Sequence, residues 1–285
     1  MKSKYNLLLL IVLFCNVINA EDSRILATGG ATQVEGSAGG GIVPWAVIAG
    51  YSQEDEWGST VFSTFIKTDD FSLTSYGAAV GFENRFEFSF AKQTFDLGSL
   101  QNLLGLPENQ LEQNIFGFKV KFLGDLIYGD WPQISFGIQH KEIENFEIPS
   151  IVGALDDEGE DYYLSASKLW LDGVQGYPLL VSVTLRSTMA NQIGLLGYGG
   201  DLNDGRETLI EVNTSLLISR NWIVGYEYRQ KPDNLAFAEE NDWQDIYLAW
   251  FYDKSISAVM AYVDLGSIAS LEKQQGFYFS VQATF

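Results

Sequence analysis

Cysteine, histidine and basic side chains are all scarce in this chain. Cys15 is the only cysteine and His140 the only histidine among 285 residues. If the segment that holds Cys15 is removed on export, no thiol is left for disulfides or thiolate chemistry. Asp and Glu (37) outnumber Lys and Arg (17), and the net charge is −20. This acidity argues against nucleic acid as a partner, because phosphates need cationic groups.

Long apolar runs are also missing, apart from one at the N-terminus. Two lysines precede an apolar run at 7–15, and the small residue Ala20 follows it. The run is shorter than the roughly 20 apolar residues of a spanning helix, and the pattern is that of a secretory signal peptide. We therefore expect residues 1–20 to be a cleaved signal and residues 21–285 to form a single domain.

Alternating strands are what the remaining composition favours. Aromatics make up 14% of the chain and glycines number 28, yet the mean hydropathy is only +0.01. Strands of a membrane barrel give such averages, because only half of each strand faces lipid. The last nine residues alternate most clearly, with one wholly apolar face: Phe277, Phe279, Val281, Ala283 and Phe285.

This C-terminal strand resembles the closing strand of bacterial outer-membrane barrels. In those proteins the barrel-assembly machinery reads the terminal aromatic pattern, which implies that Phe277, Phe279, Val281 and Phe285 form an assembly signal here. The last strand of a soluble sandwich also alternates, so the strand alone leaves that alternative open.

Connection lengths decide between the two classes. Thirteen strand candidates have clear boundaries, and a weaker one at 25–34 makes fourteen. Long and short connections then alternate, as in outer-membrane barrels, which have even strand numbers and both termini in the periplasm. We predict an all-β, transmembrane, antiparallel up-and-down barrel of about 14 strands, with 12 as the alternative. The candidates lie at 25–34, 42–51, 59–67, 71–82, 85–95, 114–124, 133–142, 161–171, 177–186, 208–217, 221–230, 243–252, 255–264 and 276–285.

Side-chain parity predicts which residues point into this barrel. The apolar parity is expected to face lipid, because a lipid-facing Arg or Lys costs about 2–4 kcal/mol near the midplane. In two strands, 161–171 (which contains Lys168) and 255–264, apolar and polar residues do not separate cleanly between the two parities. The interior candidates form either a constriction that sorts small solutes or an ion-pair lattice that fills the barrel. They are Arg85, Glu87, Lys119, Lys121, Arg186, Glu211, Glu227 and Arg229.

The long connections carry two further patterns. Clustered acidic residues at 156–161, 201–204 and 239–242 lack the spacing of a Ca²⁺ loop, so solvated loops are favoured over cation sites. Apolar residues in these loops predict loop packing, a plug of the mouth or a site for a hydrophobic substrate, with a short helix at 98–106. They are Leu100, Leu103, Leu104, Leu106, Ile193, Leu195, Leu196, Leu235 and Phe237.

Several motifs resemble an uncharacterised family of Gram-negative outer-membrane proteins, catalogued as domain of unknown function 3034. They lie at 26–30, 35–46, 190–201, 231–235, 242–243 and 261–266. The resemblance covers nearly all of the mature chain. It implies membership, a place in the outer membrane and a barrel, and it implies no activity.

Catalytic and cofactor chemistry find little support. The outer-membrane phospholipase arrangement has a serine two residues after its histidine, whereas Glu142 follows His140 here. The glycine run at 194–201 lacks the Lys-Ser/Thr of a phosphate loop. We therefore expect no enzyme activity, no cofactor and no metal.

The favoured function is a passive channel for small solutes. A non-conducting structural or anchoring barrel is the alternative, and a channel for a hydrophobic substrate is the third possibility. The expected partners are outer-membrane lipid, lipopolysaccharide and the barrel-assembly machinery, in a monomer or a homo-oligomer.

Overall fold

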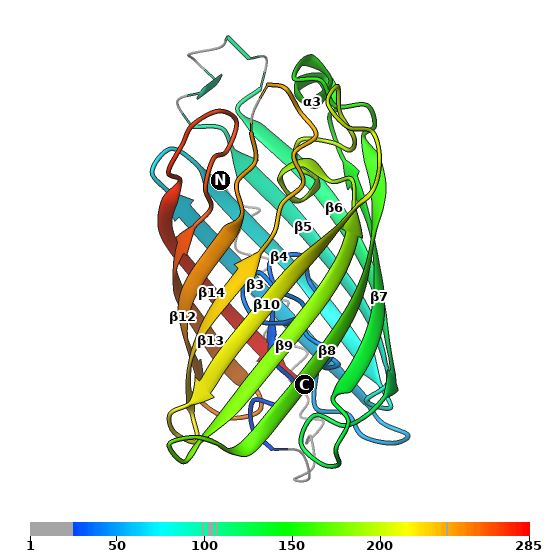
Figure 1. Cartoon of the computed structure of the whole chain (residues 1–285), viewed down its shortest axis with the longest axis vertical. Helices are drawn as coiled ribbons and strands as arrows, with labels where there is room; N and C mark the ends of the chain where they lie inside the picture. Colours follow the sequence, from blue (N-terminus) through cyan, green and yellow to red (C-terminus); the bar gives the residue numbers. More distant parts are fainter. Residues whose placement is uncertain (1–24, 99, 102–104, 107, 238) are drawn as a thin grey trace, which may run out of the picture.

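The chain folds into a closed antiparallel barrel (Figure 1). The computed structural model describes residues 25–98, 100–101, 105–106, 108–237 and 239–285. Within these residues the wall has 12 strands in sequence order, and β14 closes the barrel on β3. The strands are β3 (Trp57–Thr68), β4 (Ser72–Phe82), β5 (Phe86–Asp96), β6 (Gln110–Leu123), β7 (Gln133–Ile143), β8 (Glu158–Val174), β9 (Tyr177–Thr188), β10 (Glu207–Leu217), β11 (Trp222–Arg229), β12 (Trp243–Phe251), β13 (Ile256–Asp264) and β14 (Gln275–Thr284).

The predicted count of about 14 was wrong, and the alternative of 12 was right. Two predicted strands, 25–34 and 42–51, do not join the wall. The first contains only the two-residue strand β1 (Ala31–Thr32), which pairs inside the barrel with β2 (Ala38–Gly39) from the stretch between the two predicted strands (blue in Figure 1). Residues 28–52 are all buried, and we call this segment the plug.

The predicted facing of the wall is confirmed. Apolar side chains cover the outside, among them Phe88, Phe116, Val183 and Phe279, while the opposite parity is buried. Such an apolar outer band around a polar interior is typical of barrels in lipid. In the described residues no helix is long and apolar enough to cross a membrane.

Contacts with the plug and with a rim turn explain the two strands in which apolar and polar residues did not separate by parity. β13 is apolar on both faces because Val259, Ala261 and Val263 belong to the same buried cluster as plug residues. Lys168 shares the outward parity, but its ammonium reaches the turn at 125–129 and donates to four carbonyls there. A long side chain at a barrel rim can place its charge in this way.

The two ends of the barrel differ. Short turns and the C-terminus lie at one end, which we call the turn end (lower end in Figure 1). The first described residues, Ile25 and Leu26, line a groove there with the turns at 176–178, 217–221 and 252–255. Longer connections lie at the opposite end, the loop end, and include α3 (Glu147–Ile151) and the 3-10 turn η1 (Asn191–Gly194).

Candidate functional site

One buried ion pair holds both sides of the plug near the turn end. The Glu87 carboxylate on β5 accepts hydrogen bonds from the backbone N–H of Ala38 (3.1 Å) and Ala49 (2.8 Å). Lys119 on β6 lies 3.1 Å from Glu87 and donates to the carbonyls of Ala38 (2.9 Å) and Val47 (3.0 Å). Because charged hydrogen bonds are stronger than neutral ones, this pair is a principal attachment of the plug.

A second attachment lies at the glycine run of the plug. Glu227 on β11 accepts from the N–H of Gly41 (2.7 Å) and Ile42 (2.8 Å), and buried Asp245 faces it across the strand pair. A Cβ on Gly40 would lie 1.8 Å from Glu227 Oε1. Only glycine therefore lets the plug backbone approach this carboxylate so closely.

Neutral side chains of the wall bind the remaining backbone groups of the plug. Ser75 and Gln93 both donate to the Val34 carbonyl, at 2.7 and 2.8 Å. Thr184 donates to Pro44 O (2.8 Å), and Gln133 donates to Ala46 O (2.7 Å). Since buried backbone groups need partners, the wall supplies for the plug what a neighbouring strand would supply in a sheet.

Glu35 of the plug lies at the centre of an ion cluster in the loop-end half. Its carboxylate pairs with Lys141, with Arg229 Nη1 (2.7 Å) and with Arg186 Nη2 (3.5 Å). Asp161 and Glu211 of the wall complete the cluster. Three cations thus meet three carboxylates, and every one of these side chains is at most 3% exposed.

A segment from the loop end closes the barrel over this cluster. Residues 190–199, which we call the cap, are buried. The Ile193 carbonyl accepts from Lys141 (3.1 Å), so one ammonium contacts the plug, the wall and the cap. Gln192 N–H donates to Glu240 (2.7 Å), which lies 3.0 Å from Lys231. Burial raises the pKa of Glu240 and lowers the pKa of Lys231.

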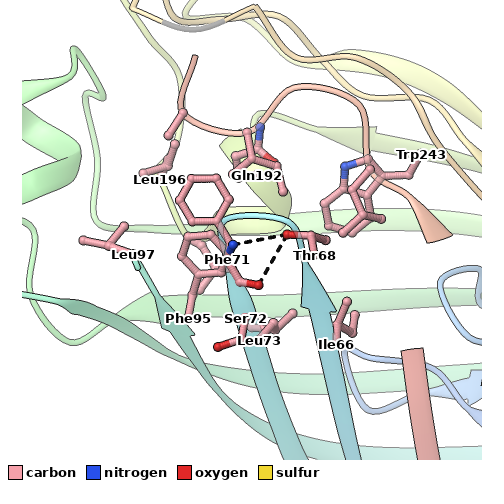
Figure 2. A pocket seen from close by; sticks show the side chains of 14 residues that line it. Ile66, Thr68, Phe71, Ser72, Leu73, Phe95, Leu97, Gln192, Leu196 and Trp243 are labelled. Atoms are coloured by element: carbon pink, nitrogen blue, oxygen red, sulfur yellow. Dashed lines mark hydrogen bonds between the residues drawn. The ribbon is translucent and has the colours of Figure 1, made fainter. Parts of the chain in front are cut away.

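A small apolar pocket lies beneath the cap (Figure 2). Cap residues Leu195 and Leu196 line it with Phe71, Phe95 and Trp243, beside the turn in which Thr68 Oγ1 and Phe71 exchange hydrogen bonds. Its volume is about 30 Å³. Pockets for drug-sized ligands measure roughly 300–1,000 Å³, so this cavity has room for a methyl-sized group only.

The other predicted apolar loop residues have varied places. Leu100, Ile193 and Leu235 are buried in the core, Leu106 packs against it, and Phe237 is exposed. Leu103 and Leu104 lie outside the described residues, and so the predicted helix at 98–106 stays a prediction.

Six of the eight predicted interior residues contact the plug or its ion cluster. They are Glu87, Lys119, Arg186, Glu211, Glu227 and Arg229. Arg85 instead lies exposed in the turn between β4 and β5, with its guanidinium 5.5 Å from the Phe86 ring centre, and Lys121 is half-buried at the end of β6.

The prediction missed three members of the ion cluster. Lys141 and Asp161 follow the inward parity of their strands, so the same rule would have found them. Glu35 lies in a segment without period-two alternation, where parity gives no information.

The acidic clusters at 156–161 and 239–242 were predicted as solvated loops, but Asp161 and Glu240 are buried in ion pairs, because Asp161 faces inward on β8 and Glu240 packs against the cap. His140 lies on the outer face, with its ring nitrogens 3.5 Å from Glu160 and 3.9 Å from Glu158. Within the described ranges no group of three His, Cys, Asp or Glu side chains is arranged to hold a metal.

Comparison with known proteins gives a family and a fold. The family model described as "Protein of unknown function (DUF3034)" matches residues 28–282. No curated protein sequence matches the chain. The solved structure of the KdgM porin is 12% identical with a TM-score of 0.51, covering 79% of this chain and 99% of that one. At such identity the likeness is one of fold.

Two other solved structures are more distant. The outer-membrane protein Omp33 of Acinetobacter baumannii is 8% identical, with a TM-score of 0.45 over 81% of this chain and 99% of that one. Outer membrane phospholipase A of Escherichia coli is also 8% identical, with a TM-score of 0.42 over 79% and 89% of the two chains.

Proposed function

Because this chain belongs to the DUF3034 family of proteins of unknown function, whose name carries no activity, we propose a function from the barrel itself. The protein is a gated passive channel for small hydrophilic solutes in the bacterial outer membrane. The plug at 28–52 is its gate, and the conformation described above is the closed one.

The outer surface and the strand order support a place in the outer membrane. The apolar exterior suits lipid, and the fold is that of a porin. The turn end, with its short connections, is assigned to the periplasm and the loop end to the outside. On this assignment the exposed side chains of Phe277, Phe279 and Val281, with terminal Phe285, face the assembly machinery during insertion.

The observation that carries the channel proposal is the chemistry of the contact between plug and wall. The wall binds the plug through charged and polar side chains, including Glu87, Lys119, Glu227 and Gln133. If the plug withdrew, these groups would line a hydrated passage. Such groups suit both conformations, because they satisfy the plug backbone in the closed barrel and would be hydrated in the open one.

Complete burial of the plug favours the non-conducting barrel as a second candidate. Val34, Glu35, Ile42 and Val43 are 0% exposed, so no water reaches them in the closed conformation. If the plug never leaves, the protein is a structural or anchoring barrel. The hydrophobic-substrate channel is the weakest of the three, because the apolar pocket is only about 30 Å³.

Single-channel conductance of a plug-displaced variant distinguishes these candidates. Gly40→Val places a side chain where Glu227 lies, and Gly205→Ala in an exposed loop is the matched control. We expect wild-type protein and the control to be mostly silent in planar bilayers, and Gly40→Val to open frequently.

Thiol labelling shows whether the plug has moved in the same variant. Cys15 is the only cysteine of the sequence, so in a protein prepared without residues 1–20, Ser37→Cys places a single thiol, in the buried plug. If Gly40→Val makes this thiol reactive in a folded barrel and the bilayer stays silent, the channel proposal is refuted and the structural barrel is favoured.

A further inference from the structure

The ion cluster around Glu35 has the composition of a carboxylate-binding site that is already occupied. The wall alone contributes three cations, Lys141, Arg186 and Arg229, against two carboxylates, Asp161 and Glu211. The third carboxylate belongs to the plug. If the plug withdrew, the five wall side chains of the cluster would keep one positive charge more than their two carboxylates balance, facing the hydrated passage, with Glu227 and Asp245 as the next carboxylates along the wall.

The wall fixes the direction of these cations independently of Glu35. Arg186 is held by Glu211 (2.5 Å), by Gln139 (2.8 Å) and by Asp161 (3.1 Å), and its guanidinium lies 5.3 Å from the Tyr163 ring centre. Asp161 also holds Lys141, at 2.7 Å.

Arg229 has a similar anchor, with its Nε 3.2 Å from Glu211, although its Nη1 also donates to Ile42 O of the plug at 3.1 Å. All three cations therefore have at least one wall carboxylate as a permanent partner. The place that Glu35 fills would persist as a pre-oriented set of N–H donors.

We propose that Lys141, Arg186 and Arg229 bind the carboxylate of a small organic acid in the open barrel, and that Glu35 occupies this site in the closed one. The proposal rests on the gated channel proposed above, and it names the class of solute. Planar guanidinium groups and an ammonium are the donors that recognise carboxylates, and the surplus charge favours a monoanion over a neutral solute.

Occupation of one site by two ligands makes them competitors. A soluble carboxylate binds only when Glu35 has left, so it lengthens the time that the plug spends outside. If Glu35 is removed by mutation, the same carboxylate fills the empty place and restores the charge balance of the closed barrel. Acetate should therefore have opposite effects on plug opening in the wild-type barrel and in Glu35→Ala.

The test measures the labelling rate of Ser37→Cys in the folded barrel of residues 21–285. Sodium acetate is compared with acetamide and with sodium chloride at equal ionic strength. With Glu35 intact, acetate binds only the open barrel, so at ten times its Kd it should accelerate labelling about tenfold, by the factor 1 + [L]/Kd. In Glu35→Ala it binds both conformations but the dry, closed site more tightly, so it should slow labelling by a factor that saturates at the ratio of its two dissociation constants. Acetamide and chloride should do neither.

Controls separate the site from general salt effects. Adding Arg229→Gln to Glu35→Ala should abolish the acetate response, while Glu112→Ala, which removes a half-buried carboxylate far from the ion cluster, should behave like the wild-type barrel. Equal responses to acetate, acetamide and chloride in both backgrounds would overturn the proposal. The wild-type background does not depend on the fold of the variant, so a misfolded Glu35→Ala barrel still leaves a decisive measurement.

The same experiment keeps the two proposals apart. Labelling reports plug position and requires no current. A response to acetate without conductance would refute the channel alone, and conductance without a response to acetate would refute the carboxylate site alone.

Discussion

Glu87→Ala tests most directly whether the plug is a gate. The substitution removes the acceptor of two plug N–H groups, those of Ala38 and Ala49, and takes the counterion from buried Lys119. Removing one partner of a buried ion pair costs about 3–5 kcal/mol. Lys119 keeps its two bonds to plug carbonyls, so we expect the lower end of that range.

A loss of about 3 kcal/mol corresponds to an increase of roughly 150-fold in the open-to-closed ratio of the plug, at about 1.4 kcal/mol for each factor of ten. The labelling rate of Ser37→Cys is proportional to this ratio when closing is faster than labelling. The wall strands keep their own hydrogen-bond ladders, so the barrel itself should remain folded and heat-modifiable in electrophoresis.

Glu112→Ala is the matched control for this measurement. Glu112 lies 2.9 Å from Lys92 at the exposed rim, and such surface pairs contribute about 0–1 kcal/mol. Labelling should therefore change less than about fivefold. If Glu87→Ala labels as slowly as Glu112→Ala in a folded barrel, the reasoning about the plug attachment is refuted.

Three further predictions concern assembly, facing and pH. Phe285→Ala should lower the yield of heat-modifiable barrel, because the terminal aromatic resembles the assembly signal; an unchanged yield would contradict this. Val183→Arg should lower the free energy of unfolding by about 2–4 kcal/mol, since its side chain faces lipid. Thr184→Arg should instead displace Pro44 of the plug and expose the thiol of Ser37→Cys. If Val183→Arg and Thr184→Arg had equal effects, the assignment of Val183 to the outer face and Thr184 to the inner face would be refuted. Burial raises the pKa of Glu240, so this carboxyl group holds a proton more tightly when the cap is closed than when it is open. Raising the pH from 4.5 through the raised pKa should therefore weaken the closed cap. Glu240→Gln should abolish this dependence in the labelling of Ser267→Cys, a buried position whose carbonyl accepts a hydrogen bond from the Gln192 side chain of the cap.

Parity and turn residues were enough to place the wall. All 12 wall strands were predicted within a few residues of their bounds, because a half-buried strand must alternate to satisfy lipid outside and polar groups inside. Six of the eight interior candidates chosen by the same rule contact the plug or its ion cluster. Arg85 failed because it lies one residue before its strand, in a turn, where alternation does not apply.

The plug was missed because its sequence imitates a strand. Residues 42–51 are apolar on both parities, which suits a segment buried on all sides better than a wall strand. Two-sided apolarity in β13 has the same cause, since its inner face packs in the cluster that contains the plug. Contacts such as Glu35 with Lys141 join residues 106 positions apart, and no local pattern specifies them.

The connection between the plug and β3 is only four residues long, from 53 to 56. At about 3.3–3.6 Å for each residue, this tether allows a reach of about 13 Å. The withdrawn segment therefore stays near the barrel opening at an effective concentration in the millimolar range, as for other short flexible linkers. Reclosure would be fast and unimolecular, openings would be brief, and a dissolved competitor would need to reach about millimolar concentration before it could prolong them.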